Sequence, residues 1–372
     1  MADRQTRKSG IELLKIFAVF LIVISHVVQT LGALDGVYQL RLSLATTDMS
    51  RLMLAALRYS GVLGNSIFFV CSAWFLVDAK KWNLRKLLYL WSQVWSVSAL
   101  ILLIVLVLGD VPLRKGILFE SLLPVIFNNN WYISCYMMFC LIVPLLNIVL
   151  GVLTRRQLLS VCVMGTILCG IRFAFMGYAA PFYINGIILW SIIYFCVAYI
   201  KRYKPMWFSN YKYGGICFTA GVIGFVGMII LANSLGQKIS VFSSALLRWN
   251  ENGNLFIILT AIGLLLLAHN TRIQSRFINT ISGLSLLVYI IHENLLLRTF
   301  YRPKLFDWLY HTYGSVNLVA WSLIFAAAIF IGSVIVSYCY QQTVCRLLAK
   351  VCDWLYPKLE LGWNRLLDRL EK

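Results

Sequence analysis

Three ionisable side chains lie within the first long apolar stretch of the chain, residues 11–32: Glu12, Lys15 and His26. Lys15 precedes His26 by eleven residues, about three turns of an α-helix, and Glu12 precedes Lys15 by three. On a helix, these side chains share one face. Ionisable groups inside an apolar segment are costly, by about 2.5–3.5 kcal/mol each, and are therefore functional candidates. His26 is predicted to act as a general base or as a nucleophile, because a neutral imidazole exchanges protons near neutral pH.

Glu12 and Lys15 would then form a charged entrance below His26, with Glu12 orienting or charge-balancing Lys15 close to the substrate. An alternative stays open for each residue. Glu12 and Lys15 would reach the lipid headgroups and pair weakly there, and His26 would only bond to a neighbouring helix.

A second pair, His292 and Glu293, lies in a later apolar segment, residues 281–298. Adjacent residues point about 100° apart on a helix, so we expect one to touch the site while the other supports it or faces water. The alternative is an interfacial pair close to Arg298. Further candidates for substrate contact are polar or aromatic residues inside apolar segments or at their ends: Ser72, Asn130, Trp131, Tyr136 and Arg172. Trp131 also fits an ordinary interfacial aromatic belt.

The composition indicates which kind of structure holds these residues in place. The 372 residues are 60% hydrophobic and 13% charged, with a mean hydropathy of +0.80, whereas soluble domains average about 45–50% apolar and about 25% charged residues. A soluble enzyme, a disordered chain and a coiled coil are excluded. Ten apolar segments recur at roughly 11–32, 57–77, 87–109, 131–153, 159–178, 183–200, 213–234, 254–269, 281–298 and 315–340. The prediction is an all-α polytopic membrane bundle of about ten transmembrane helices over residues 1–340, followed by a cytoplasmic amphipathic tail over 341–372 that is interrupted at Pro357.

The net charge of +19 has a definite distribution. With ten spans, 21 of the 33 Lys and Arg lie on the same side as the N-terminus and 11 on the other. The positive-inside rule therefore predicts that both termini are cytoplasmic. The bases would meet anionic lipids or an anionic cytoplasmic ligand and not nucleic acid. Since the ten cysteines form no CxxC pair and no Cys/His cluster, neither a disulfide framework nor a metal site is expected.

Four motifs occur in an order that resembles the acyltransferase-3 family of integral membrane acyltransferases. They are the Lys15-x10-His26 spacing, FFVCSAWFL at 68–76, NNNWYISCYMMFCLIVPLLN at 128–147 and VYIIHEN at 288–294. Two positions depart from the family pattern. Ala73 stands where the family has a glycine after the serine, and Tyr89 stands where a third basic residue of the loop is usual.

The resemblance implies transfer of an acyl group, usually acetyl, from cytoplasmic acyl-CoA to a hydroxyl of a surface polysaccharide or of its lipid-linked precursor. It makes His26 the essential histidine, Lys15 its basic partner and His292 the histidine of the late span. Arg85 and Lys86, together with Lys15, would hold the phosphates of CoA. The protein would reside in a bacterial plasma or inner membrane and use no metal. By the same resemblance, we expect a stand-alone member without the extracellular hydrolase-like domain that some relatives append, and a separate periplasmic or extracellular protein could then accept the acyl group.

A transporter or flippase of a lipid-linked saccharide is the alternative, because charges within spans also form permeation paths. Such a protein would not depend on acyl-CoA. It would also show similarity between its halves, and the motifs of the first four spans do not recur in the last six. A membrane sensor that binds a small ligand is a third interpretation, and it would not need the Lys15–His26 spacing.

Overall fold

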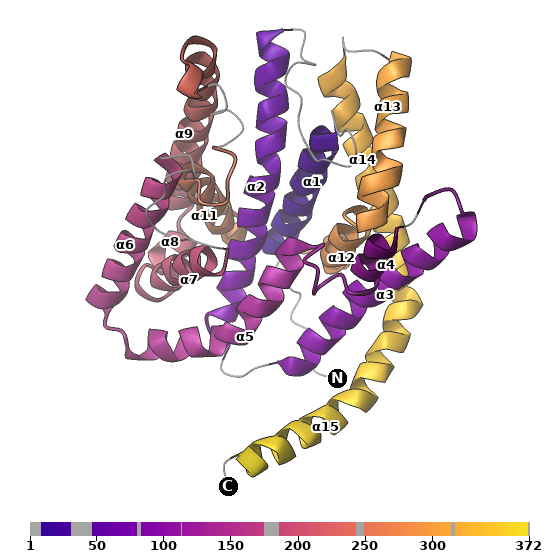
Figure 1. Ribbon diagram of the computed structural model, residues 1–372. Helices are drawn as coiled ribbons and strands as arrows, with labels where there is room; N and C mark the ends of the chain where they lie inside the picture. The colour runs from indigo at the N-terminus through magenta and orange to yellow at the C-terminus, as the bar shows by residue number, and fades with distance from the viewer. Residues whose placement is uncertain are drawn as a thin grey trace.

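The computed structural model describes residues 9–30, 47–79, 83–112, 114–174, 186–242, 249–313 and 317–370. These residues form helices joined by short connections, and no β-strand occurs among them (Figure 1). The helices in chain order are α1 (Gly10–Thr30), α2 (Asp48–Leu76), α3 (Leu84–Leu108), α4 (Lys115–Leu122), α5 (Trp131–Val152), α6 (Arg155–Ala174), α7 (Gly186–Tyr203), α8 (Met206–Ser209), α9 (Tyr211–Lys238), η2 (Ser240–Phe242), α11 (Leu255–Asn270), α12 (Arg276–His292), η3 (Leu297–Tyr301), α13 (Arg302–Tyr313), α14 (Leu318–Gln342) and α15 (Val344–Leu370).

The predicted membrane helix bundle is confirmed, and each of the ten apolar segments contains a helix. In the described part of the chain, seven helices are long and apolar enough to cross a membrane: α1, α2, α3, α5, α7, α9 and α14. An eighth span results if the bent pair of α12 and the 297–309 segment counts as one. The count of ten is not confirmed, because α11 has only 16 residues and α6 opens on Arg155, Arg156 and Gln157.

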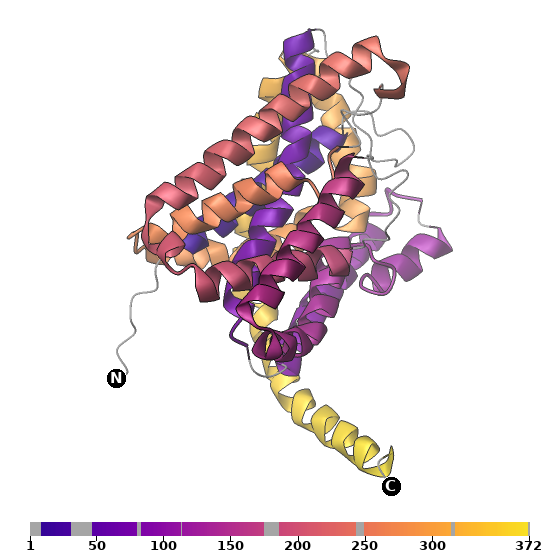
Figure 2. The same ribbon diagram turned by 90° about the vertical axis from the view of Figure 1, so that its left-hand side faces the viewer.

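The helix α1 lies in the interior of the bundle, where it contacts α2, α11, α12 and α14 (Figures 1 and 2). Many of its apolar residues are almost fully buried, for example Ala18, Val23 and Val27, whereas Leu13 and Phe17 are exposed. Because α1 is held on several sides, its few polar side chains have fixed directions. Any chemistry of the face that carries Lys15 and His26 therefore takes place inside the bundle.

Two glycines of α2 bring its backbone against α1. A Cβ atom on Gly64 would lie 2.4 Å from the carbonyl oxygen of Ala18, and one on Gly61 would lie 2.4 Å from Oγ of Ser25. Ser25 uses this close approach, because its hydroxyl donates to the carbonyl of Arg58 over 2.6 Å. Small residues at a helix contact are the usual means of close packing in a membrane, where no hydrophobic force drives helices together. The contact fixes the part of α1 that carries His26.

Replacing Gly64 with leucine should therefore destabilise the bundle by about 1–3 kcal/mol through overpacking. The measurement is the midpoint of thermal unfolding of the purified protein in detergent. Gly332→Leu in α14 is the matched control, because a Cβ atom at Gly332 meets open space. Equal midpoints for the two variants would contradict the close α1–α2 contact.

The helix α12 ends at His292, and the chain bends by 63° before it continues as the 297–309 segment. The side chain of Asn294 stabilises the break. Its Oδ1 accepts from the amide of Leu296 over 3.0 Å, and its Nδ2 donates to Oγ of Ser98 on α3 over 3.3 Å. The predicted continuous segment 281–298 is therefore a broken helix. The break occurs at the pair that the sequence analysis singled out, His292 and Glu293.

The predicted tail is one long helix, α15, which continues through Pro357. The expected interruption at Pro357 is wrong, because a proline removes one helical hydrogen bond and can kink a helix without ending it.

Polar contacts along one side join the α14–α15 segment to α3. Oγ of Ser96 and Oη of Tyr340 lie 2.5 Å apart, and Nε2 of Gln93 donates to Sγ of Cys345 over 3.4 Å. Figures 1 and 2 show that the C-terminal half of α15 extends away from the bundle.

Candidate functional site

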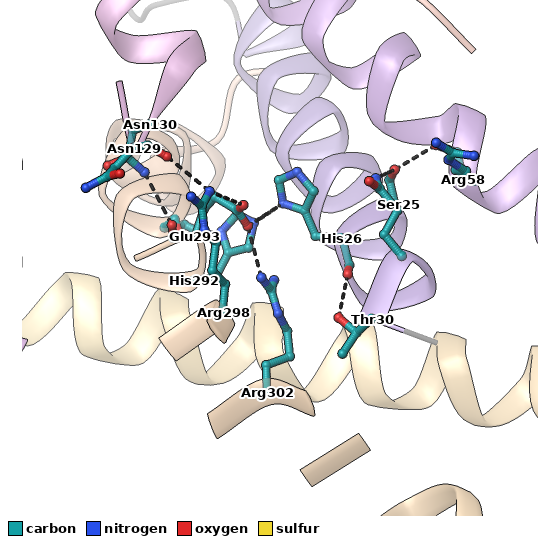
Figure 3. Close-up of polar contacts among 12 residues, drawn as sticks. Ser25, His26, Thr30, Arg58, Asn129, Asn130, His292, Glu293, Arg298 and Arg302 are labelled. Atoms are coloured by element: carbon teal, nitrogen blue, oxygen red, sulfur yellow. Dashed lines mark hydrogen bonds and ion pairs between the residues drawn. The ribbon is translucent and has the colours of Figure 1, made fainter. Parts of the chain in front are cut away.

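The side chain of His26 on α1 meets His292 and Glu293 at the break after α12 (Figure 3). Its Nδ1 lies 2.9 Å from Oε2 of Glu293 and 3.0 Å from Nε2 of His292. The prediction that His292 and Glu293 cannot both face one group is wrong, because it assumed a regular helix. Glu293 follows the last helical residue with φ −102° and ψ 14°, so both side chains reach the same nitrogen of His26.

The hydrogen bonds of His292 determine which nitrogen of His26 carries the proton. Nδ1 of His292 lies 2.7 Å from the carbonyl oxygen of Val288, which only accepts, so this Nδ1 donates. In neutral His292, Nε2 is then an acceptor, as are the carboxylate oxygens of Glu293. Nδ1 of His26 faces these acceptors and is assigned the proton, which leaves the lone pair on Nε2. His26 is therefore in the tautomer that a general base or a nucleophile requires.

Two arginines hold the carboxylate of Glu293 in place. Nη1 of Arg298 lies 3.1 Å from Oε1, and Nη2 of Arg302 lies 3.2 Å from Oε2. Glu293 and Arg302 are each 5% exposed. We call His26, His292, Glu293, Arg298 and Arg302 the His26 cluster. Its carboxylate is buried and also paired, which is the condition under which a charge is stable in a low-dielectric interior.

The residues that precede α5 contact the same break. The carbonyl of Asn129 accepts from Nη1 of Arg298 over 3.1 Å, and Nδ2 of Asn130 donates to the backbone carbonyl of Glu293 over 3.4 Å (Figure 3). Asn130 is 2% exposed. Its observed contact is with the backbone of the cluster, so Asn130 positions Glu293 in this conformation. Its predicted contact with a substrate stays a prediction.

Lys15 and Glu12 lie at the other end of the same face of α1. Nζ of Lys15 is 2.7 Å from Oε2 of Glu12, and the hydroxyl of Ser282 on α12 donates to the same oxygen. Glu12 is 2% exposed, and the side chain of Lys15 is 19% exposed. Glu12 thus forms a buried contact between α1 and α12 and pairs there with the partly exposed Lys15. Glu12 charge-balances and orients Lys15, as its spacing predicts.

A small void lies between the Lys15 end and the His26 end of this face. Its wall comes from α1, α2, α5 and α12, and the residues that line it are Val19, Ile22, Phe68, Tyr132, Ser285, Leu286 and Tyr289. The ring centroid of Tyr289 lies 6.5 Å from that of His26 and 6.0 Å from that of Tyr132. The void has room for little more than one water molecule, so it marks an apolar seam, with Tyr289 toward its His26 end, and not a formed ligand channel.

The other predicted contact residues lie apart from the His26 cluster or show a local role. Oγ of Ser72 donates to the carbonyl of Phe68 on its own helix over 2.9 Å, and Tyr136 on α5 is a hydrogen-bonding neighbour of Ser72. Trp131 is half-buried at the start of α5, with its ring against that of Tyr132. Arg172 falls at the end of α6, and its side chain lies outside the described residues.

Arg85 and Lys86 occupy the first turn of α3, which Asn83 caps by accepting from the amide of Lys86 over 3.0 Å. Both side chains are exposed. Arg85 forms an ion pair with Asp353 of α15. An exposed basic helix start is accessible to a polyphosphate, but the structure places neither residue next to His26.

The sequence did not identify Arg302 and Ser282 as parts of the site. A signal was present, because two arginines follow the His-Glu pair within ten residues. On a regular helix, however, Arg302 would lie far from Glu293, and only the break brings the two side chains together.

His26, His292 and Glu293 also offer three ligand atoms within 4.8 Å of one another, a set suited in type to a divalent transition metal. The same carboxylate already binds two guanidinium groups. Adding a dication beside two fixed cations is electrostatically unfavourable. The cluster is better suited to proton transfer than to metal binding.

A model of a protein family, described as an acyltransferase domain, matches residues 8–339. The chain belongs to the acyltransferase-3 family. Comparisons with curated proteins and with solved structures found no match. The range shared with the acyltransferase-3 family runs from the residues before α1 to the last turn of α14, so it contains the His26 cluster, Lys15 and the void. The helix α15 follows it. Membership of the family supports acyl transfer by a multi-pass membrane domain and confirms the resemblance found in the sequence.

Proposed function

We propose that the protein is a membrane O-acyltransferase of a bacterial plasma or inner membrane. It moves an acyl group, acetyl in the simplest case, from cytoplasmic acyl-CoA to a hydroxyl of a surface polysaccharide or of its lipid-linked precursor. The observation that carries the proposal is the contact of His26 with Glu293 and His292. This contact directs the proton of His26 to Nδ1 and leaves a basic Nε2 within a membrane domain of an acyltransferase family.

In the proposed reaction, Nε2 of His26 takes the proton of the acceptor hydroxyl while the oxygen attacks the thioester carbonyl carbon. The C–S bond of the tetrahedral intermediate then breaks, and His26 returns the proton to the departing thiolate of CoA. The carboxylate of Glu293 stabilises the imidazolium that exists between the two proton transfers. The acyl ester and free CoA are the products. If His26 instead attacked the thioester itself, an acyl-histidine would precede transfer to the hydroxyl.

The donor would approach from the end of α1 that carries Lys15. Lys15 and the basic start of α3 would hold its phosphates. Its thin pantetheine arm would lie along the apolar seam toward His26, and the side chains of the seam would have to move apart to admit it. Lys15 and His26 are eleven positions apart, or about 16 Å along the helix, and this is the distance that the donor would span between its phosphates and its thioester. The acceptor would reach His26 from the opposite end.

Incubation of the purified protein in lipid nanodiscs with radiolabelled acetyl-CoA and a panel of glycans tests the proposal. We expect label on a glycan only when protein, donor and acceptor are all present. A lipid-linked saccharide that crosses vesicles containing the protein without any acyl-CoA would instead support a transporter. A protein that leaves every glycan unlabelled across donors and acceptors would contradict the proposed acyl transfer.

Replacing Lys15 with glutamine should raise the KM for acyl-CoA by about 10–100-fold, because a charge-assisted contact contributes about 1.5–3 kcal/mol. The turnover number should change much less, since Lys15 lies far from the reacting atoms. Initial rates at varied acyl-CoA measure both constants. Lys15→Arg, which keeps the charge, should restore most of the affinity.

A Lys15→Gln variant leaves Glu12 buried without its cation, which can destabilise the bundle. The double variant Glu12→Gln/Lys15→Gln removes both charges and should keep the raised KM. Lys304→Gln, an exposed lysine on α13, is the matched control and should leave KM unchanged. An unchanged KM in the double variant would contradict the donor role of Lys15.

A further inference from the structure

The helix α15 has a row of large apolar side chains that are each about half exposed or more. Leu347, Val351, Trp354 and Leu361 recur at spacings of four, three and seven residues, so they share one face of the helix. Their exposures are 62%, 46%, 64% and 53%. The proposed acyl transfer makes no use of this face.

A different side of α15 attaches it to the membrane domain. Sγ of Cys352 lies 3.6 Å from Oγ of Ser92, and Asp353 pairs with Arg85, both on α3. Cys345 and Cys352 are buried. The first half of α15 is thus fixed along α3, and its bare apolar face is not the face that packs on the bundle. Because α14, the preceding helix, has the length and composition of a membrane span, α15 begins where a span ends.

Basic side chains flank the apolar row. Arg346, Lys350, Lys358 and Arg365 are spread along the helix. Nζ of Lys358 lies 3.3 Å from the ring centroid of Trp354, a cation–π contact. Leucine and tryptophan on one face with lysine and arginine beside them is the pattern of a helix that lies in the headgroup region of an anionic membrane.

We propose that α15 binds the surface of a bilayer that contains anionic lipid, with Leu347, Val351 and Trp354 among the acyl chains and Lys350 and Lys358 at the phosphates. The Asp353–Arg85 contact joins this surface helix to the start of α3. Binding of α15 to lipid therefore holds the basic start of α3 at the membrane surface.

Fluorescence quenching of Trp354 tests the proposal on the full-length protein in nanodiscs. The contribution of Trp354 is the difference in emission between the wild type and Trp354→Phe. Phosphatidylcholine with brominated acyl chains, mixed with phosphatidylglycerol, should quench this contribution at least about twofold, because bromine quenches only rings at chain depth. In nanodiscs without phosphatidylglycerol, the quenching should be clearly weaker.

Trp91 provides the positive control, because it lies 40% exposed on the membrane helix α3, and Trp91→Phe isolates its emission. Quenching of Trp91 without quenching of Trp354 would overturn the proposal. Equal quenching of Trp354 with and without phosphatidylglycerol would overturn the claim that α15 prefers a bilayer that contains anionic lipid. Lys350→Gln/Lys358→Gln, which leaves the apolar row intact, should lose the dependence on phosphatidylglycerol. None of these readouts depends on acyl transfer, so the result stands apart from the proposed function.

Discussion

Replacement of His26 with alanine is expected to lower the rate of acyl transfer by about 10²–10⁴-fold, the usual loss when a general base is removed. The physical reason is that His26 is the group whose Nε2 is left basic by the contacts of its Nδ1 with Glu293 and His292. His292 cannot take this role, because its Nδ1 donates to the carbonyl of Val288 and its Nε2 accepts from Nδ1 of His26. The turnover number with a saturating donor and acceptor measures the effect.

His311→Ala is the matched control for this variant, because His311 is exposed near the end of α13. It should transfer acyl groups at the wild-type rate. Unfolding midpoints show whether His26→Ala remains folded. Turnover of His26→Ala within a few-fold of the wild type would contradict the mechanism. Incubation with radiolabelled acyl-CoA in the absence of acceptor separates the two chemical roles of His26, because only a nucleophile retains label on the protein.

The helical face of α1 could be predicted from the sequence, and the reason is local geometry. Residues three and eleven positions apart lie on one side of any α-helix, so the Glu12–Lys15 contact and the shared direction of Lys15 and His26 needed no tertiary information. The fold class could also be predicted from local sequence, because apolar segments long enough to span a membrane indicate membrane helices.

The geometry around Glu293 could not be predicted in the same way. The helix breaks after His292 because Asn294 bonds to Ser98, and because Asn130 bonds to the carbonyl of Glu293. These partners are 196 and 163 residues away in the chain. Such contacts form only when the bundle assembles, and they decide that Arg302 reaches Glu293. On an unbroken helix, adjacent residues point about 100° apart, and this is why the sequence predicted that His292 and Glu293 diverge. The break makes that prediction wrong.

The second large effect is expected for Glu293→Gln, which should lower the turnover number by about 10²–10⁴-fold with little change in the KM for acyl-CoA. An amide has one acceptor and one donor end, whereas the contacts of Glu293 require two acceptors. Oε1 faces Arg298, and Oε2 faces both His26 and Arg302. In either orientation of the amide, its NH₂ group opposes a donor. With the NH₂ toward His26, the proton of His26 moves to Nε2, and the base is lost. In a Ser-His-Asp triad, the equivalent change costs about 10⁴-fold.

A loss of activity in Glu293→Gln has to be separated from a loss of folding, because the variant leaves two buried or half-buried guanidinium groups without their anion. Asp307→Asn on α13 is the matched control, since Asp307 is exposed on the same bent segment. Nitrogen NMR of labelled histidine gives a readout that a purely structural role would not move. It should find the proton of His26 on Nδ1 in the wild type. In a Glu293→Gln protein of unchanged unfolding midpoint, it should find the proton on Nε2 where the NH₂ faces His26. Where the amide oxygen faces His26, the proton stays on Nδ1 and turnover falls because the imidazolium lacks its anion. A folded variant that keeps the wild-type tautomer and turnover would show that the carboxylate only supports the bend, and the proton transfer would then need another explanation.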